Sequence, residues 1–175
     1  MSVRNVAQAA QTTTRAVYSI FGSKAGLIEA LAARGYGLLA DYVDELPTTD
    51  DPNADLVNAG ISGFRRFALE RPHLFRLTFE RAPVGIAEMP SAVDAAMTAY
   101  QALVRRIDRL RATGPTRNLT QAEVAFAVHA LCTGLASNEL ARQQSPTGVS
   151  FWRHVPEFDA VRVWRHALHA LIAGL

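Results

Sequence analysis

Residues 6–31, VAQAAQTTTRAVYSIFGSKAGLIEAL, contain two short apolar-patterned segments separated by a polar turn. Thr13 stands directly before the second segment, where a side-chain oxygen can cap a helix that begins at Thr14. Gly22 and Ser23 then supply a stop for that helix and a cap for the next one. The stretch therefore predicts two short helices joined by a tight turn and followed at once by a third.

Small and apolar residues would let the first two helices pack closely. The first segment offers Val6, Ala9 and Ala10 on one face. The second segment offers Val17 and Phe21. Two short helices packed around a tight turn form a helix-turn-helix, the unit that places its second helix in the major groove of DNA. Taken alone, this pattern is a weak indicator of DNA binding.

The same stretch is similar, nearly residue for residue, to the DNA-binding segment of the tetracycline-repressor (TetR) family of transcriptional regulators. The strong similarity covers residues 2 to about 31. In such units the beginning of the second helix faces base edges, and Arg15 is of a type that pairs bidentately with guanine. Other positions of the family motif contact phosphates. The resemblance implies DNA contacts by Thr13, Thr14, Arg15, Tyr18, Ser19 and Lys24.

The chain departs from the family pattern at several positions. Gln11 stands in the turn where Gly is usual, and Arg15 and Ile20 differ from the commonest choices, so the operator sequence is not predicted. The family also has a helix before the position of Ser2, and this sequence shows no counterpart. We therefore expect an incomplete, abnormally packed DNA-binding unit with weak operator binding. We expect the following apolar side chains to be partly bare: Val3, Val6, Val17 and Phe21.

Composition narrows the class of protein. The chain has 175 residues, a formal net charge of +2 and a single cysteine, Cys132, which excludes an internal disulfide framework and favours a reducing compartment. It shows neither a signal-peptide pattern nor an apolar run of ~18 residues, so we expect a soluble cytoplasmic protein that does not enter a membrane. Arg4, Arg15 and Lys24 precede the first acidic residue, Glu29, which fits a surface that meets an anionic partner.

Apolar residues recur three and four positions apart along the whole chain, and the breaks are clusters of Pro, Gly and Asp. This periodicity predicts an all-α fold. After the helix-turn-helix, we expect helices over about residues 24–45, 57–68, 72–79, 91–113, 120–144 and 157–174. Thr120 and Glu123 have the spacing of a capping box at the start of a helix that is apolar on nearly every side.

Residues 64–83, FRRFALERPHLFRLTFERAP, resemble the start of a ligand-sensing domain found in part of the same family. The resemblance implies a DNA-binding unit over residues 1–31 and an effector-binding and dimerisation domain over residues 32–175. Large inward-facing groups with few charges predict a cavity for a small, mostly apolar effector. An aromatic stripe at helical spacing also fits plain core, so each candidate keeps both interpretations. The candidates are Phe64, Phe67, Phe75, Phe79, Met97, Tyr100, Phe126 and His129.

The last two long helices carry more apolar surface than one subunit can bury, which predicts a homodimer. In the family these helices pair with those of a second subunit as a four-helix bundle. The candidate interface residues are Leu131, Leu135, Trp164, Leu168 and Leu171. We expect Trp164→Asp or Leu135→Arg to give monomers or aggregates.

Two other classes of protein stay open. His129 and Cys132, three residues apart, could form the thiol-imidazole pair of an enzyme, and His166 and His169 could hold a metal. Neither pair is completed by a recognisable third group, so we predict no catalytic residue, no metal and no cofactor. The second alternative is a helical ligand-binding dimer that does not bind DNA. Our hypothesis is a one-component regulator, a repressor that an effector releases from its operator.

Overall fold

The computed structural model describes residues 2–80, 85–114, 119–143 and 155–175, and every regular element within them is helical, which confirms the all-α prediction. The α-helices are α1 (Val3–Ala9), α2 (Thr14–Phe21), α3 (Lys24–Asp44), α4 (Pro52–Asn58), α5 (Arg66–Glu70), α6 (Pro72–Phe75), α7 (Pro90–Ala112), α8 (Gln121–Gln143) and α9 (Ala160–Ala173). Two π-helical segments, η1 (Ala59–Arg65) and η2 (Arg76–Glu80), and a 3-10 turn, η3 (Ile86–Glu88), complete them.

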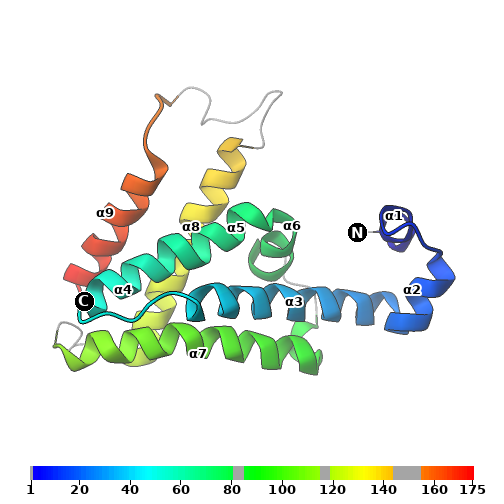
Figure 1. The fold of residues 1–175 in the computed structure, drawn as a ribbon, viewed down its shortest axis with the longest axis horizontal. Helices are drawn as coiled ribbons and strands as arrows, with labels where there is room; N and C mark the ends of the chain where they lie inside the picture. The colour runs from blue at the N-terminus through cyan, green and yellow to red at the C-terminus, as the bar shows by residue number, and fades with distance from the viewer. Residues whose placement is uncertain (1, 81–84, 115–118, 144–154) are drawn as a thin grey trace.

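The N-terminal unit, formed by α1, α2 and the first turns of α3, projects from one end of the molecule (Figure 1). Its helix boundaries follow from local capping. The Thr13 hydroxyl accepts a hydrogen bond from the Ala16 N–H (3.1 Å), and the Ser23 hydroxyl accepts one from the Gly26 N–H (3.0 Å). Gly22 ends α2 with a φ of +70°, a conformation that suits glycine.

The turn between α1 and α2 contains a strained residue. Gln11 has a φ of +51°, in the left-handed region that residues other than glycine rarely adopt. This is the position where the resemblance leads us to expect glycine. The turn therefore keeps the conformation for which glycine is suited, at a cost of roughly 1 kcal/mol in backbone strain.

The N-terminal unit has a hydrophobic cluster of its own, which contains Val3, Ala7, Val17 and Leu27. We expected Val3 and Val17 to be partly bare, but they are only 8% and 5% exposed, because α1, α2 and α3 enclose them. That part of the expectation is wrong. Phe21, like Val6, is indeed only partly buried.

The main domain is built on the long pair α3 and α7, which lie side by side (Figure 1). Arg106 on α7 is buried, and its guanidinium donates hydrogen bonds to the carbonyls of Val43 (2.9 Å), Leu46 (2.8 Å) and Pro47 (3.1 Å). These carbonyls lie at or beyond the C-terminal end of α3, where a helix leaves acceptors without partners. Arg106 therefore caps α3 and fixes it to α7.

Residues 52–70 form one continuous helical run, α4–η1–α5, because η1 joins the two α-helices without a break. Its small residues allow close packing: a Cβ on Gly60 would lie 2.6 Å from Leu168 on α9 and 3.5 Å from Cys132 on α8. Arg71 ends the run, and Pro72 starts α6 as the sequence predicts.

The last two helices pack on this run. The predicted capping box is present, since the Glu123 carboxylate accepts from the Thr120 N–H and hydroxyl (2.6 and 2.7 Å). Trp164 on α9 is 1% exposed, and Leu168 is also fully buried. Both side chains belong to the core of the single subunit, which corrects their expected place on a subunit interface. Trp164→Asp should therefore disturb folding rather than assembly alone.

Candidate functional site

The first candidate site is the outer surface of the N-terminal unit. Side chains with hydroxyl, phenol or cationic groups are exposed there at the start of α2, along α2 and at the start of α3. They are the predicted DNA-contacting residues Thr13, Thr14, Arg15, Tyr18, Ser19 and Lys24. The N-terminal ends of α2 and α3 add the partial positive charge of their helix dipoles, which favours an anion.

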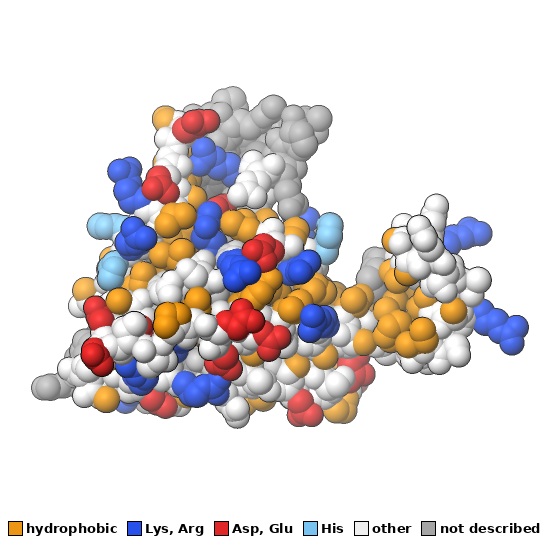
Figure 2. Space-filling view, in the orientation of Figure 1, with side chains coloured by type: hydrophobic (Ala, Val, Ile, Leu, Met, Phe, Trp, Pro, Cys, Tyr) orange, Lys and Arg blue, Asp and Glu red, His pale blue; other side chains and the backbone are white. Residues whose placement is uncertain are grey.

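Figure 2 shows Lys and Arg side chains at the outer edge of this unit, away from the main domain. Within the part of the chain that the structure describes, neither Arg15 nor Lys24 forms an ion pair. Their positive charges are therefore available to a partner. An exposed helix start with free cations has the chemistry of a surface that contacts DNA phosphates and bases.

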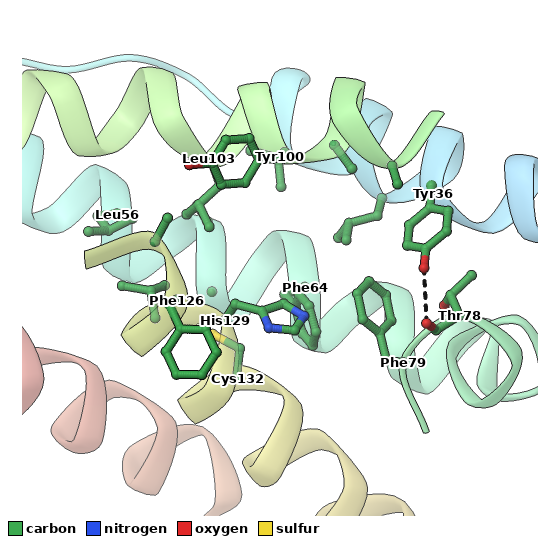
Figure 3. Close-up of a pocket in the computed structure, with 18 of the residues that line it drawn as sticks. Tyr36, Leu56, Phe64, Thr78, Phe79, Tyr100, Leu103, Phe126, His129 and Cys132 are labelled. Carbon is green, nitrogen blue, oxygen red and sulfur yellow. Dashed lines mark hydrogen bonds between the residues drawn. The ribbon is translucent and has the colours of Figure 1, made fainter. Parts of the chain in front are cut away.

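The second candidate site is a cavity of about 520 Å³ between the α3–α7 pair, η1, η2 and α8 (Figure 3). Its wall is mostly aliphatic and aromatic. The lining residues are Tyr36, Leu39, Val43, Leu56, Ala59, Gly60, Phe64, Thr78, Phe79, Ala96, Ala99, Tyr100, Leu103, Ala122, Ala125, Phe126, Val128, His129 and Cys132. This volume and this character are those of a small-molecule pocket.

The structure separates the predicted lining residues into three groups. Phe64, Phe79, Tyr100, Phe126 and His129 line the cavity. Phe67 and Phe75 do not: they are fully buried in the core, where Phe75 packs edge-on against Phe64 at a ring-centroid distance of 6.0 Å. Met97 lies outside the lining as well and is 48% exposed on α7.

Sequence reasoning missed lining residues of two kinds. Tyr36 and Thr78 meet at one end of the cavity, where the Tyr36 hydroxyl points at the backbone carbonyl of Thr78 (Figure 3). Tyr36 could have been found as a polar-tipped residue on the apolar side of α3. The small residues, such as Gly60, Ala99 and Ala125, carry no comparable signal. They create the cavity by leaving space, whereas the candidate lining residues were selected for their large side chains.

Ionisable groups in the cavity wall are kept neutral. Desolvation raises the pKa of Tyr36 and lowers the pKa of His129 from its ordinary value, because burial disfavours the charged form of each. Burial also raises the pKa of the Cys132 thiol to about 12. At neutral pH the wall therefore carries a phenol, an imidazole and a thiol rather than charged groups.

These facts bear on the alternative that the chain is an enzyme. A thiol with a pKa of about 12 forms almost no thiolate, and thiolate is the nucleophilic species. The His129 Nε2 atom lies 3.4 Å from the hydroxyl of Thr133. His166 and His169 are exposed on α9, and no group of three or more His, Cys, Asp or Glu among the described residues could hold a metal.

The candidate residues for contact with a second subunit lie on α8 and α9. Leu131, Leu135 and Leu171 pack on the core but stay partly exposed, whereas Phe126 on α8 is 74% exposed.

Of the described helices, only α8 is long and apolar enough to cross a membrane, with a mean hydropathy of 1.2. A core helix of a soluble protein meets the same criterion, and Glu139 on α8 forms an ion pair inside the domain.

Comparisons with known proteins agree with this architecture. The family described as "Tetracyclin repressor-like, C-terminal domain" matches residues 57–171. A protein of unknown function from Rhodococcus sp. RHA1 has a similar structure, with a TM-score of 0.74, 20% identity, and coverage of 100% of this chain and 84% of that one. The TetR family transcriptional regulator PfmR from Thermus thermophilus is also similar, with a TM-score of 0.67, 19% identity, and coverage of 99% and 88%.

No curated protein matches the chain. At these identities the two solved structures show the fold, and the family match over most of the chain shows the relationship. The match covers α7, α8 and most of α9 and includes the cavity-lining residues from Ala59 onwards, whereas Tyr36, Leu39 and Val43 on α3 and Leu56 on α4 lie outside it. This chain therefore belongs to the TetR family of transcriptional regulators.

Proposed function

We propose that the chain is a one-component regulator that binds operator DNA as a homodimer through α2 and responds to a small, mostly apolar effector in the cavity. The observation that carries this proposal is the course of α3. Lys24 begins α3 beside α2, while Tyr36, Leu39 and Val43 on the same helix line the cavity. One continuous helix therefore contacts both candidate sites.

The contacts between α3 and α7 support coupling between these sites. Near the N-terminal unit, the Glu29 carboxylate accepts hydrogen bonds from the N–H (3.0 Å) and hydroxyl (2.6 Å) of Ser91. At the other end Arg105 pairs with Asp44 at 2.7 Å. A ligand inserted between this helix pair and α8 would displace α3 together with α7, and so move the N-terminal unit.

The direction of the response is part of the proposal. We propose that the effector-free dimer holds its two α2 helices at the spacing of the operator half-sites, and that the effector favours another spacing. Operator affinity would then fall when the effector binds, and the protein would act as a repressor in the cytoplasm.

The exposed faces of α8 and α9 are the proposed subunit interface. Leu135, Phe158 and Val163 line a shallow groove of about 130 Å³ between the two helices. Gly134 lies on the exposed side of α8, and a Cβ there would meet nothing within 4 Å. This combination of apolar and small residues lets a second helix approach closely.

DNA binding is tested with a duplex selected from a random pool by the wild-type chain and with an unrelated duplex, by fluorescence anisotropy over a range of salt concentrations. Arg15→Ala should weaken binding to the selected duplex about tenfold or more and bring it towards the unrelated one. Lys24→Ala should weaken binding to both and reduce the salt-dependence slope by about 1.

Arg71→Ala is the control, because Arg71 is exposed between α5 and α6, outside α2, outside the start of α3 and outside the proposed interface on α8 and α9. It should leave both affinities unchanged. If selection enriches no sequence, or if all three variants behave alike, the chain is better described as a helical ligand-binding dimer without a DNA function.

A further inference from the structure

The cavity wall contains no Asp, Glu, Lys or Arg side chain among the described residues. Its ionisable groups, Tyr36, Tyr100, His129 and Cys132, include no permanently charged one, and burial holds three of them in their neutral forms. A charged ligand would lose its hydration there without gaining a counter-charge, which costs several kcal/mol. The wall therefore selects against carboxylates and ammonium groups.

The hydroxyl groups of Tyr36 and Thr78 already donate their hydrogens to backbone carbonyls. The Tyr36 hydroxyl donates to the backbone carbonyl of Thr78 at 3.0 Å (Figure 3). The Thr78 hydroxyl donates in turn to the carbonyl of Leu74 at 2.9 Å. Both oxygens keep lone pairs but offer no proton to a ligand. At this end the cavity can only accept a hydrogen bond, so a ligand must donate one.

His129 lies in the cavity wall, where two phenylalanine rings pack against its imidazole (Figure 3). Its imidazole packs against Phe79 (centroids 5.4 Å apart) and edge-on against Phe64 (6.2 Å). One ring nitrogen, Nε2, lies 3.4 Å from the Thr133 hydroxyl on the next turn of α8. The neutral ring has one donor and one acceptor, so whichever tautomer is present the other nitrogen can pair with a group that both donates and accepts.

We infer that the effector is an uncharged, mostly apolar molecule with a hydroxyl group, an alcohol or a phenol, whose hydroxyl pairs with His129 while its carbon skeleton lies against Phe64 and Phe79. The inference rests on the proposed function, because it takes this cavity as the effector site. A hydroxyl both donates and accepts, so it can pair with His129 in either tautomer, whereas an ether or a ketone only accepts.

The test uses one carbon skeleton with three head groups: 4-hexylphenol, 4-hexylanisole and 4-hexylbenzoate at pH 7.5. Affinities are measured by thermal shift and by titration calorimetry. The phenol should bind about tenfold more tightly than the anisole, the equivalent of one hydrogen bond. The benzoate should bind at least about a hundredfold more weakly than the phenol.

Two variants locate the effect. His129→Phe should lower the affinity for the phenol about tenfold, to the level of the anisole, because it removes both ring nitrogens and keeps an aromatic ring. Ala99→Leu, which places a larger side chain in the cavity, should weaken binding of all three compounds. His73→Phe is the matched control: His73 is exposed on α6, outside the lining, and this change should alter none of the affinities.

Equal binding of the three compounds, a preference for the benzoate, or no binding of any of them would overturn the inference. Binding of the selected duplex is measured on the same preparation without any compound. Retained DNA binding together with one of these results means that the effector class is wrong while the regulatory function stands. Loss of both means that the proposed function fails as well.

Discussion

Asp55 is a buried carboxylate, 4% exposed, at the start of the run that forms one wall of the cavity. Burial by itself raises its pKa, but hydrogen bonds from the Thr49 N–H (2.9 Å), the Thr49 hydroxyl (2.8 Å) and Arg109 outweigh burial. The pKa of Asp55 is therefore lower in the folded protein than in the unfolded chain. The ionised carboxylate contributes stability that is complete above its unfolded pKa of about 3.9 and is lost as the pH falls through the lower folded value.

Asp55→Asn tests this assignment, because asparagine has nearly the same shape and no charge. At pH 7 we expect the variant to lose about 2 kcal/mol of unfolding free energy, the range for hydrogen bonds to a charged group. The deficit should shrink as the pH falls from about 4 towards the lower folded pKa, because the unfolded wild-type chain binds a proton on Asp55 before the folded protein does. Urea unfolding at several pH values measures the loss of unfolding free energy and its change with pH. Asp50 is exposed, so Asp50→Asn is the control. A deficit that does not change with pH would contradict the assignment.

Single residues also show where sequence reasoning stops. Phe64, Phe67, Phe75 and Phe79 all lie on apolar faces at helical spacing, so a sequence treats them alike. Phe64 and Phe79 line the cavity, whereas Phe67 and Phe75 lie fully buried behind them and pack against the Phe79 ring. The distinction depends on which helix lies across from each ring. A single sequence does not contain that information.

At the scale of elements, one buried cluster joins η1, α8 and α9. The Glu139 carboxylate on α8 accepts two hydrogen bonds from Arg65 (2.6 and 2.9 Å) and one from the indole N–H of Trp164 (3.0 Å). The side chain of Glu139 is 9% exposed. Removal of the carboxylate would leave a guanidinium and an indole N–H without their partner.

We expect Glu139→Ala to lower the unfolding free energy by about 3 kcal/mol or more, the range for a broken buried ion pair. The pair of Arg105 and Asp44 also engages both carboxylate oxygens (2.7 Å each) but is exposed, so Asp44→Ala is the control and should cost less than about 1 kcal/mol. Urea unfolding at fixed protein concentration measures both. Equal losses would show that burial of the Glu139 pair does not decide its contribution.

The elements themselves were largely predictable, because their ends are set by local residues. Thr13, Ser23 and the Thr120–Glu123 capping box start helices in the structure as the sequence indicates. The π-helical segment η1 was not predictable, and its Gly60 packs against Leu168 on α9, a long-range contact that local residues do not indicate. Burial of Trp164 within one subunit was missed for a similar reason: the acceptor for its indole N–H lies on another helix.

At the scale of the whole molecule, the proposed dimer gives a test that does not disturb the fold. A Cβ on Gly134 would meet nothing within 4 Å, so a larger side chain there fits the isolated subunit. We expect Gly134→Arg to turn a dimer into a monomer in sedimentation velocity at micromolar concentration, because it places a cation between two closely packed helices. The circular dichroism of the variant should match that of the wild type.

Gly37→Arg is the matched control. Gly37 is also helical, and a Cβ at that position would likewise meet nothing within 4 Å, but it lies on α3. It should leave the dimer intact. A wild-type chain that sediments as a monomer, or a Gly134→Arg variant that remains a dimer, would exclude this face of α8 as the interface.

The continuity of α3 has a geometric consequence. The expected boundary between residues 31 and 32 falls inside this helix, so no flexible linker separates the N-terminal unit from the cavity. In an α-helix each added residue turns whatever follows by about 100° and advances it by about 1.5 Å. One residue inserted between Leu31 and Tyr36 would therefore point α2 in a different direction while leaving both hydrophobic clusters intact. The length of α3 therefore sets the orientation of the proposed DNA-contacting surface relative to the cavity.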